Sequence, residues 1–205
     1  MRARRARGRN PVVSRRAFTL VELLVVLLIL AAVAGVAVTM TAGQGQDAAQ
    51  KATDVSLVRI REAILGGAEG PGYKSDRPDG RLPATIADLL RMPAMDQAFD
   101  PVAKVGWRGP YLRQQGATYT VQGTFTVAYG TTGDPAVLDG WARPIVLQIP
   151  TSGANADENE LNARLVSAGP NGVIDCSPTA LTPADLDASG RGDDRVLFLS
   201  TADTP

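Results

Sequence analysis

A basic segment that runs directly into a long uncharged stretch constrains this chain more than any other feature. Arg15 and Arg16 lead into it, and between Glu22 and Asp47 there are 24 positions without a charge. As a helix, that stretch would be about 36 Å long, which exceeds the roughly 30 Å of a bilayer core. It is apolar on all sides and longer than the core of a cleaved secretory signal, about 7–15 residues. We therefore predict a membrane-inserted helix.

Charge is distributed unevenly, although the formal net charge is zero. Seven arginines and no acidic residue precede Ala17, whereas the rest of the chain carries 14 basic and 21 acidic residues. Arginines on one side of an apolar helix favour the cytoplasm, so we predict a single-pass inner-membrane protein with its C-terminal domain in the periplasm. The body has no basic cluster with interleaved aromatic residues, so no nucleic-acid partner is expected.

The chain lacks the residues that most catalytic and metal sites need. Histidine is absent, and Cys176 is the single cysteine. Ser-His-Asp and Cys-His catalysis, Cys/His zinc sites and an internal disulfide are therefore excluded. Paired carboxylates could still perform acid–base chemistry, but the sequence does not set their geometry. We expect a protein that is not an enzyme, with Cys176 as an incidental thiol.

One rival interpretation of the N-terminus stays open at this point. The segment SRRAF, residues 14–18, also resembles a twin-arginine export signal, and the stretch AAVAGVA could hold a signal-peptidase site. Such signals have a shorter and less apolar core than this one. The length and leucine content of the stretch therefore favour the retained helix.

The segment AFTLVE, residues 17–22, resembles the type IV prepilin cleavage motif. The resemblance implies that a prepilin peptidase cuts after Ala17 and methylates the new N-terminal Phe18, and that the helix then enters a filament. The family more often has glycine before the cut, so Ala17 is a departure.

Glu22 is a carboxylate inside an apolar run, where a mid-helix charge costs about 2.5–3.5 kcal/mol on insertion scales. A buried charge is tolerated best when it has a partner. Cleavage would create one, the α-ammonium of Phe18, in the same chain or in a neighbouring subunit. The alternative is that Glu22 extends to the cytoplasmic headgroups.

The remaining pattern predicts an α+β fold, with a long N-terminal helix packed on a small antiparallel sheet. Apolar residues recur every three or four positions up to Leu65, where Gly66 and Gly67 end the helix. A loop follows, then a short helix over 83–92. Strands are expected in 118–129, with a pivot at Gly123, and in the segments RPIVLQI, ARLVSA and RVLFLS.

The predicted organisation has four parts. They are a basic leader (1–17), a transmembrane and polymerisation helix (18–45), its amphipathic continuation (46–66) and a globular α+β domain (67–205) with an acidic C-terminal loop.

The body extends the resemblance. The segments RLPATIADLL, GWRGPYL, DGWARPI and SAGPNG occur in the order expected of major pseudopilins of type II secretion. The chain departs from that pattern in having Gly140 and Ala142 around Trp141. It also has some two dozen additional residues between Leu112 and Asp139, and residues 176–192 look like a further insertion.

A calcium site follows from this resemblance. In major pseudopilins the matching loop holds calcium, and flexible loops rich in oxygen ligands suit that ion. The implied ligands are the side chain of Asn171, the carboxylates of Asp193 and Asp194, and carbonyls near Ser167 and Gly169. Asn171 replaces the usual aspartate. The alternative is that these residues, with Asp175, form ordinary turns.

The function implied is that of a structural subunit of a type II secretion pseudopilus, polymerising with copies of itself. The implied partners are a prepilin peptidase, an inner-membrane assembly platform and minor pseudopilins. The alternatives are another type IV pilin-like or minor pseudopilin subunit, and a membrane-anchored exported binding protein. An anchored hydrolase has no nucleophile–base arrangement to support it.

Overall fold

The structure is a computed structural model of the 205-residue chain that describes residues 19–68, 70–113, 116–186 and 190–200, and for residues 34–44 the backbone alone. The chain divides into two compact units, Met1–Gly45 and Gln46–Pro205. Each is described by itself. The predicted cleavage site at Ala17 and Phe18 lies outside the described residues.

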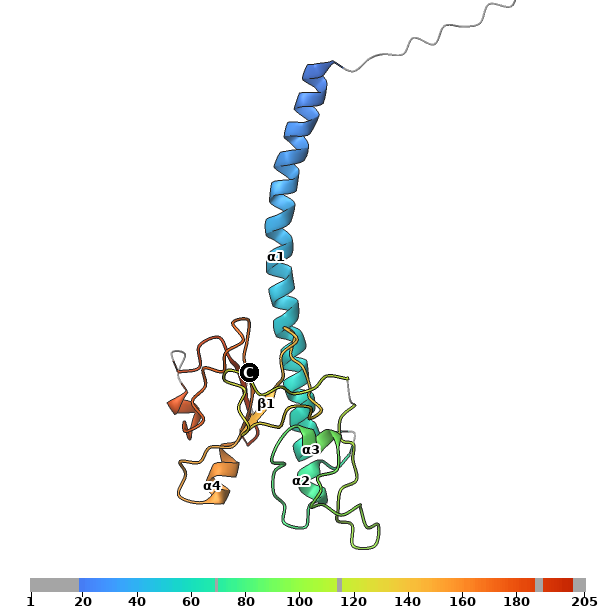
Figure 1. Cartoon of the computed structure of the whole chain (residues 1–205), viewed down its shortest axis with the longest axis vertical. Coiled ribbons are helices and arrows are strands. Elements are labelled where there is room, and N and C mark those ends of the chain that lie inside the picture. The colour runs from blue at the N-terminus through green and yellow to red at the C-terminus, as the bar shows by residue number, and fades with distance from the viewer. Residues whose placement is uncertain (1–18, 69, 114–115, 187–189, 201–205) are drawn as a thin grey trace, which may run out of the picture. The chain divides into compact units, whose positions relative to one another are not determined.

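Helix α1 spans Leu20–Leu65 and is labelled in Figure 1. Its predicted end is confirmed, because Gly66 takes a left-handed conformation (φ +93°) and donates its N–H to the carbonyl of Glu62 at 2.8 Å. Glycine is favoured there because it has no Cβ to clash. Within the described part of the chain, no helix meets the length and apolarity that a membrane span requires.

In the second unit, α1 buries the face that the sequence pattern predicts. Thr53, Leu57, Ile60 and Ile64 are almost fully buried, whereas Val55 and Val58 on the other side are about half exposed. This face belongs to a core that draws on the helix, the sheet and the short helices. Its buried members include Leu57, Ile60, Ile64, Tyr73, Ile86, Leu89, Leu90, Val137, Ile145, Leu147, Leu165 and Leu199.

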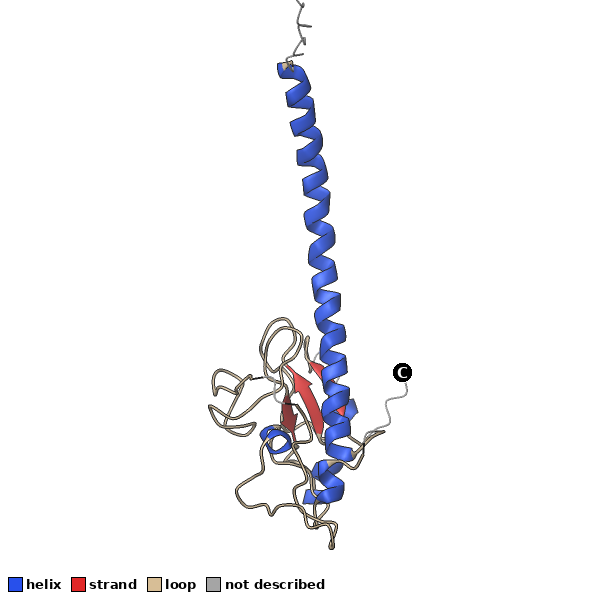
Figure 2. Cartoon of the chain, turned by 90° about the vertical axis from the view of Figure 1, so that its right-hand side faces the viewer, coloured by secondary structure: helices blue, strands red, loops and turns tan. Residues whose placement is uncertain are grey.

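The sheet has three antiparallel strands in the order β1-β2-β3: β1 Val146–Gln148, β2 Arg164–Ser167 and β3 Arg195–Phe198. These are the last three predicted strands, so the α+β prediction is confirmed. Alternate residues face opposite sides of a strand. The row Leu147–Leu165–Leu197 contributes to the core that includes α1. Figure 2 shows the lower part of α1 against the red strands.

The other face of the sheet is covered by residues 116–138 and 176–186, which belong to the two segments that the resemblance marks as additional. The row Val146–Val166–Val196 meets a second cluster that includes Tyr119 and Phe125 from the first segment. The second segment contributes Cys176, Ala180 and Leu186. Both faces of β1 and β2 are therefore buried, one by the helix and one by loops, whereas β3 is partly buried.

Arg164 fastens the second of these segments to the sheet. Its side chain is fully buried and donates to the carbonyls of Ser177 and Ala180, each at 2.7 Å, and to Oε1 of Gln148 at 3.0 Å. Burial lowers the pKa of the guanidinium. Buried donors that find three acceptors hold a loop in one place, because leaving any of them unpaired is costly.

The strands predicted in 118–129 are wrong. Gly123 is the turn as expected, with a left-handed φ of +56°, but only Gln122 and Phe125 pair across it. No partner strand extends this pairing within the described residues. Tyr119 and Phe125 instead insert their rings into the second cluster, in edge-to-face contact with centroids 6.3 Å apart.

Short helices complete the domain. The helix predicted over 83–92 is present as α3 Ala87–Leu90. The segment predicted as a plain loop after Gly67 contains α2 Tyr73–Asp76, which buries Tyr73 in the core. Helix α4 Ala156–Leu161 and the 3-10 helix η1 Pro183–Asp185 are further additions that the sequence pattern did not predict.

Candidate functional site

The first turn of α1 holds Glu22 in a defined place. Thr19 precedes the helix, and its hydroxyl accepts a hydrogen bond from the Glu22 N–H at 3.2 Å, while the Thr19 carbonyl accepts from Leu23 N–H at 3.2 Å. Thr-x-x-Glu is the spacing of a capping box, in which the threonine satisfies one of the free N–H groups of the first turn. The positive end of the helix dipole also favours a carboxylate there. Glu22 is therefore suited to its position before any partner arrives.

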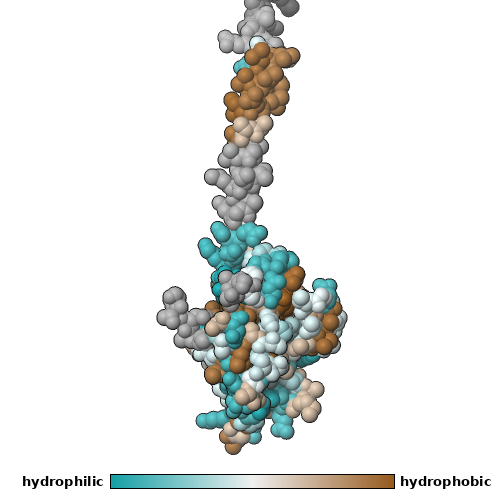
Figure 3. Space-filling view, turned by 90° about the vertical axis from the view of Figure 1, so that its left-hand side faces the viewer, coloured by the Kyte–Doolittle hydropathy of each residue, from teal (hydrophilic) through white to brown (hydrophobic). Residues whose placement is uncertain are grey.

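Apolar side chains surround α1 after this turn. From Leu20 to Val33 the large apolar residues are all exposed, on every side of the helix, and they form the brown band in Figure 3. An apolar surface of this kind marks a site of contact with other molecules or with a membrane. The first unit buries none of it within the described residues.

The residues predicted to bind calcium lie in neighbouring loops at the end of the sheet. The hydroxyl of Ser167 donates to Oδ2 of Asp139 at 2.6 Å. The carbonyl of Gly169 accepts a hydrogen bond from Nη1 of Arg143. The turn of residues 139–143 thus engages the predicted carbonyl of Gly169 and, at Ser167, the side chain and not the predicted carbonyl.

Asn171 is engaged on both ends of its amide. Its Oδ1 accepts from the N–H of Val173 at 2.6 Å, and its Nδ2 donates to Oδ2 of Asp175 at 3.1 Å. Its backbone N–H donates to Oδ2 of Asp193 at 2.9 Å. The structure therefore brings Asn171 and Asp193 together, through a backbone hydrogen bond.

Asp194 is a predicted ligand with a buried, unused oxygen. It is buried, and its Oδ2 accepts from the N–H groups of Asp175 and Cys176, each at 2.8 Å. Its Oδ1 has no hydrogen-bond donor among the described residues. Burial is the main cause that raises the pKa of this carboxyl to about 6.

These contacts do not assemble a calcium shell from the predicted set. Calcium requires six to eight oxygens around one point. Among the described residues, no three carboxylates, cysteines or histidines are grouped so that they could hold a metal. The unused oxygen of Asp194 favours a cation, whereas the guanidinium on Gly169 and the occupied amide of Asn171 oppose one.

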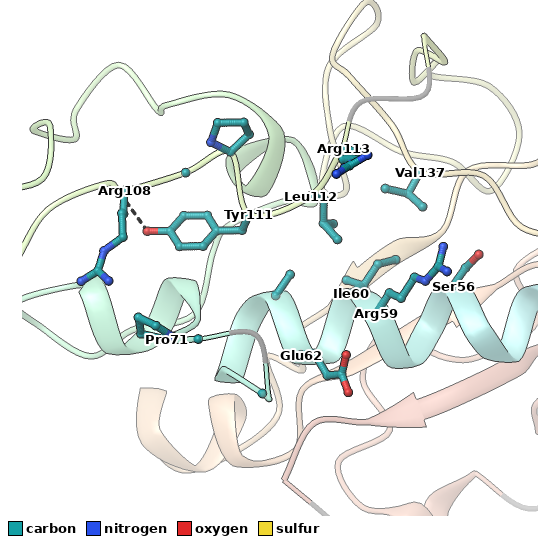
Figure 4. A pocket seen from close by; sticks show the side chains of 15 residues that line it. Ser56, Arg59, Ile60, Glu62, Pro71, Arg108, Tyr111, Leu112, Arg113 and Val137 are labelled. Atoms are coloured by element: carbon teal, nitrogen blue, oxygen red, sulfur yellow. Dashed lines mark hydrogen bonds between the residues drawn. The ribbon is translucent and has the colours of Figure 1, made fainter.

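A groove of about 770 Å³ lies between the end of α1 and residues 108–113. In Figure 4, Ser56 and Arg59 extend from the helix, and Tyr111, Leu112 and Arg113 lie on the facing segment. The Tyr111 hydroxyl accepts from the Arg108 N–H at 3.0 Å, and burial raises the pKa of Tyr111 to about 12. The same hydroxyl donates to Oδ2 of Asp76 at 3.1 Å, so the charged groups that line the groove are Arg59, Glu62, Arg108 and Arg113.

Sequence reasoning missed the residues that fix the 139–143 turn. Asp139 accepts from the N–H groups of Trp141 and Arg143, each at 2.9 Å. The Gly140 N–H donates to the buried hydroxyl of Thr53 at 2.9 Å, and a Cβ on Gly140 would lie 2.1 Å from the carbonyl oxygen of Ala49. The departure Gly140 in the motif around Trp141 was the available signal, since only glycine permits this approach.

Residues 13–38 match the family model described as the prokaryotic N-terminal methylation motif. The chain carries a type IV pilin-like prepilin signal. The matched segment includes Ala17, Phe18 and Glu22, and it indicates a membrane-anchored, exported protein. No curated protein and no solved structure matches the chain.

Proposed function

We propose that this chain is a structural subunit of a type II secretion pseudopilus. After cleavage behind Ala17 it polymerises through α1, and the growth of the filament drives protein export. The observation that carries the proposal is the methylation motif at residues 13–38, within which α1 exposes apolar side chains on every side from Leu20 to Val33. A surface of that kind suits two environments in turn, the lipid bilayer before assembly and neighbouring helices afterwards.

The order of segments in the body supports a pseudopilin over other pilin-like subunits. The DGWARPI segment forms the turn that binds α1 through Gly140 and Thr53, and the SAGPNG segment contacts that turn through Ser167 and Asp139. Motifs that are far apart in the sequence thus join in one place. The partners are copies of the same chain, a prepilin peptidase, the assembly platform and minor pseudopilins.

Intact-mass measurement on membrane and filament fractions tests this proposal. The mature protein should begin at Phe18 and carry one added methyl group on its nitrogen. Coexpression with an inactive peptidase is the control, because it should leave the leader in place. A chain that keeps its arginine leader in the presence of an active peptidase contradicts the proposal.

A second candidate function is that of a membrane-anchored binding protein. The groove beside Arg59, Arg108 and Arg113 favours it, because clustered guanidinium groups bind carboxylates and phosphates. Arg108 already pairs with Asp76 at 3.0 Å, so Arg59 and Arg113 would bind the anion. Calorimetry with inorganic phosphate and with acetate, on the wild type and on the Arg59→Ala, Arg113→Ala double variant, tests this function separately from leader processing.

A further inference from the structure

Arg143 stands where the resemblance expects a metal ion to reach the loop. Its Nη1 donates to the carbonyl of Gly169, one of the implied calcium ligands. A Cβ on Gly172 would lie 2.7 Å from the central carbon of the same guanidinium, so the loop closes tightly around it. The 169–172 turn therefore encloses a positively charged group that belongs to the chain itself.

The backbone of Arg143 is fixed by a buried carboxylate. Asp139 accepts from Arg143 N–H and Trp141 N–H through Oδ1 and from the Ser167 hydroxyl through Oδ2. The Asp139 N–H donates to the Arg143 carbonyl at 2.8 Å. One carboxylate thus joins the turn that carries the arginine to the end of β2, and the guanidinium has a defined place relative to the loop.

A bound calcium ion and this guanidinium would compete for one carbonyl. The positively charged guanidinium of Arg143 already occupies the Gly169 carbonyl. An ion bound to the same oxygen would lie next to a like charge, at a distance where repulsion is large. The other hydrogen bonds that close the loop also come from the chain itself. The Asn171 N–H donates to Asp193, and the N–H groups of Asp175 and Cys176 donate to Asp194.

We propose that Arg143 is the built-in cation of this loop, holding residues 167–176 through the Gly169 carbonyl in place of calcium. The consequence is a domain whose folding does not depend on calcium. This inference concerns the loop alone and holds whichever system the chain serves.

Thermal unfolding of the full chain in detergent, followed by tryptophan fluorescence, tests the proposal. The wild type should have the same Tm in excess calcium as in excess chelator. Arg143→Ala should lower the Tm by roughly 3–12 °C, because a charged hydrogen bond is lost and a carbonyl is left unpaired. Arg143→Lys, which keeps the charge but loses the planar geometry, should lie between them. Lys51→Ala, at an exposed cation of α1 outside the groove, is the control and should melt with the wild type.

Two results would overturn the proposal. One is a wild-type Tm that rises in calcium but not in the same concentration of magnesium. The other is an Arg143→Ala variant that melts with the wild type. If Arg143→Ala does not fold, two measurements still test the proposal. An Arg143→Lys variant with the Tm of the wild type would contradict it, and so would a wild-type Tm that rises in calcium.

Discussion

The two ends of helix α1 share one backbone and have opposite surroundings. From Leu20 to Val33 apolar side chains are exposed on every side, whereas from Thr53 to Ile64 one face is buried in a core. The stability of a helix in a protein comes mainly from packing of its apolar face. The second part has that packing within its own chain. The first part has no such packing within the described residues. Under the proposed function, lipid or neighbouring subunits would supply it.

The largest expected effect is a loss of stability on core truncation, which should distinguish the two parts of α1. Ile60→Ala should lower the free energy of unfolding by about 2–5 kcal/mol, because Ile60 is completely buried among core side chains. Leu24→Ala, the matched change in the exposed part, should alter it by less than about 0.5 kcal/mol. Denaturant unfolding of the full chain in detergent measures both. Equal losses from the two variants would remove the distinction.

Substitution of Glu22 tests whether the first part of α1 acts in filament assembly. Beside an α-ammonium of a neighbouring subunit, its attraction at an effective dielectric near 20 is about 4 kcal/mol before desolvation is subtracted. We expect Glu22→Ala to be inserted and cleaved normally but to give few filaments and no secretion, with Glu22→Asp intermediate. Shearing and sedimentation measure filament yield, and mass measures cleavage.

The capped first turn sharpens this experiment. Thr19→Ala removes the cap on the Glu22 N–H and leaves the carboxylate in place. If Glu22 acts by pairing between subunits, Thr19→Ala should assemble far better than Glu22→Ala. Similar filament yields from both variants would mean that Glu22 acts by stabilising the first turn of the helix. A wild-type yield from Glu22→Ala would mean that its carboxylate only extends to the lipid headgroups.

A polar contact of the second part should have a smaller effect. The buried Thr53 hydroxyl accepts from Gly140 N–H and donates to the Ala49 carbonyl. Thr53→Val keeps the shape and leaves that N–H unpaired, so the free energy of unfolding should fall by about 1–3 kcal/mol. Thr53→Ser keeps the hydroxyl and should lose less. If the Thr53→Val variant is as stable as the Thr53→Ser variant, the hydroxyl does not hold the 139–143 turn to the helix.

The free energy of unfolding should depend on pH through Asp194 of the globular domain. In the folded state burial raises the pKa of Asp194 to about 6, whereas an unfolded aspartate ionises near about 3.9. The folded state therefore keeps the proton that the unfolded state has lost, and stability falls as pH rises from about 4 to about 6. Asp194→Asn should remove this fall, about 1–3 kcal/mol, as seen in denaturant midpoints across that range. The same change at exposed Asp47 on α1 should leave it intact.

The smallest expected effect is a gain. Ala142 takes a left-handed conformation (φ +62°) in the turn that holds the second part of α1. A side chain there costs energy that glycine avoids, so Ala142→Gly should stabilise the domain by about 0.5–1 kcal/mol. A shift of the thermal midpoint by a few degrees would show it. A loss instead would mean that the methyl group has a packing role.

The sequence predicts what is periodic and local in this molecule. The end of α1, its buried face and the three strands follow from apolar spacing and from Gly66, and each forms where the pattern places it. The segment 118–129 alternates in the same way, but in the described structure it makes only the single bridges Thr118–Pro135 and Gln122–Phe125. Alternation alone does not say which segment a strand pairs with. The motif of the leader was predictable, because it consists of contiguous residues.

The candidate loop was less predictable for a physical reason. Its residues were recognised, but Gly169 and Ser167 are bound by Arg143 and Asp139, which are more than twenty positions away in the sequence. Which oxygen a guanidinium reaches depends on a turn whose geometry is set by Gly140 against α1. Long-range contacts of this kind have no local signature.

The two additional segments, 113–138 and 176–192, have a consequence for how such a domain can change. Tyr119 and Phe125 from one and Cys176 and Leu186 from the other cover the same apolar face of the sheet. Losing either segment alone would expose Val146 and its row to water, so the two segments depend on each other for stability. The two loop segments therefore act as one structural unit, separate from the sheet face that packs against α1.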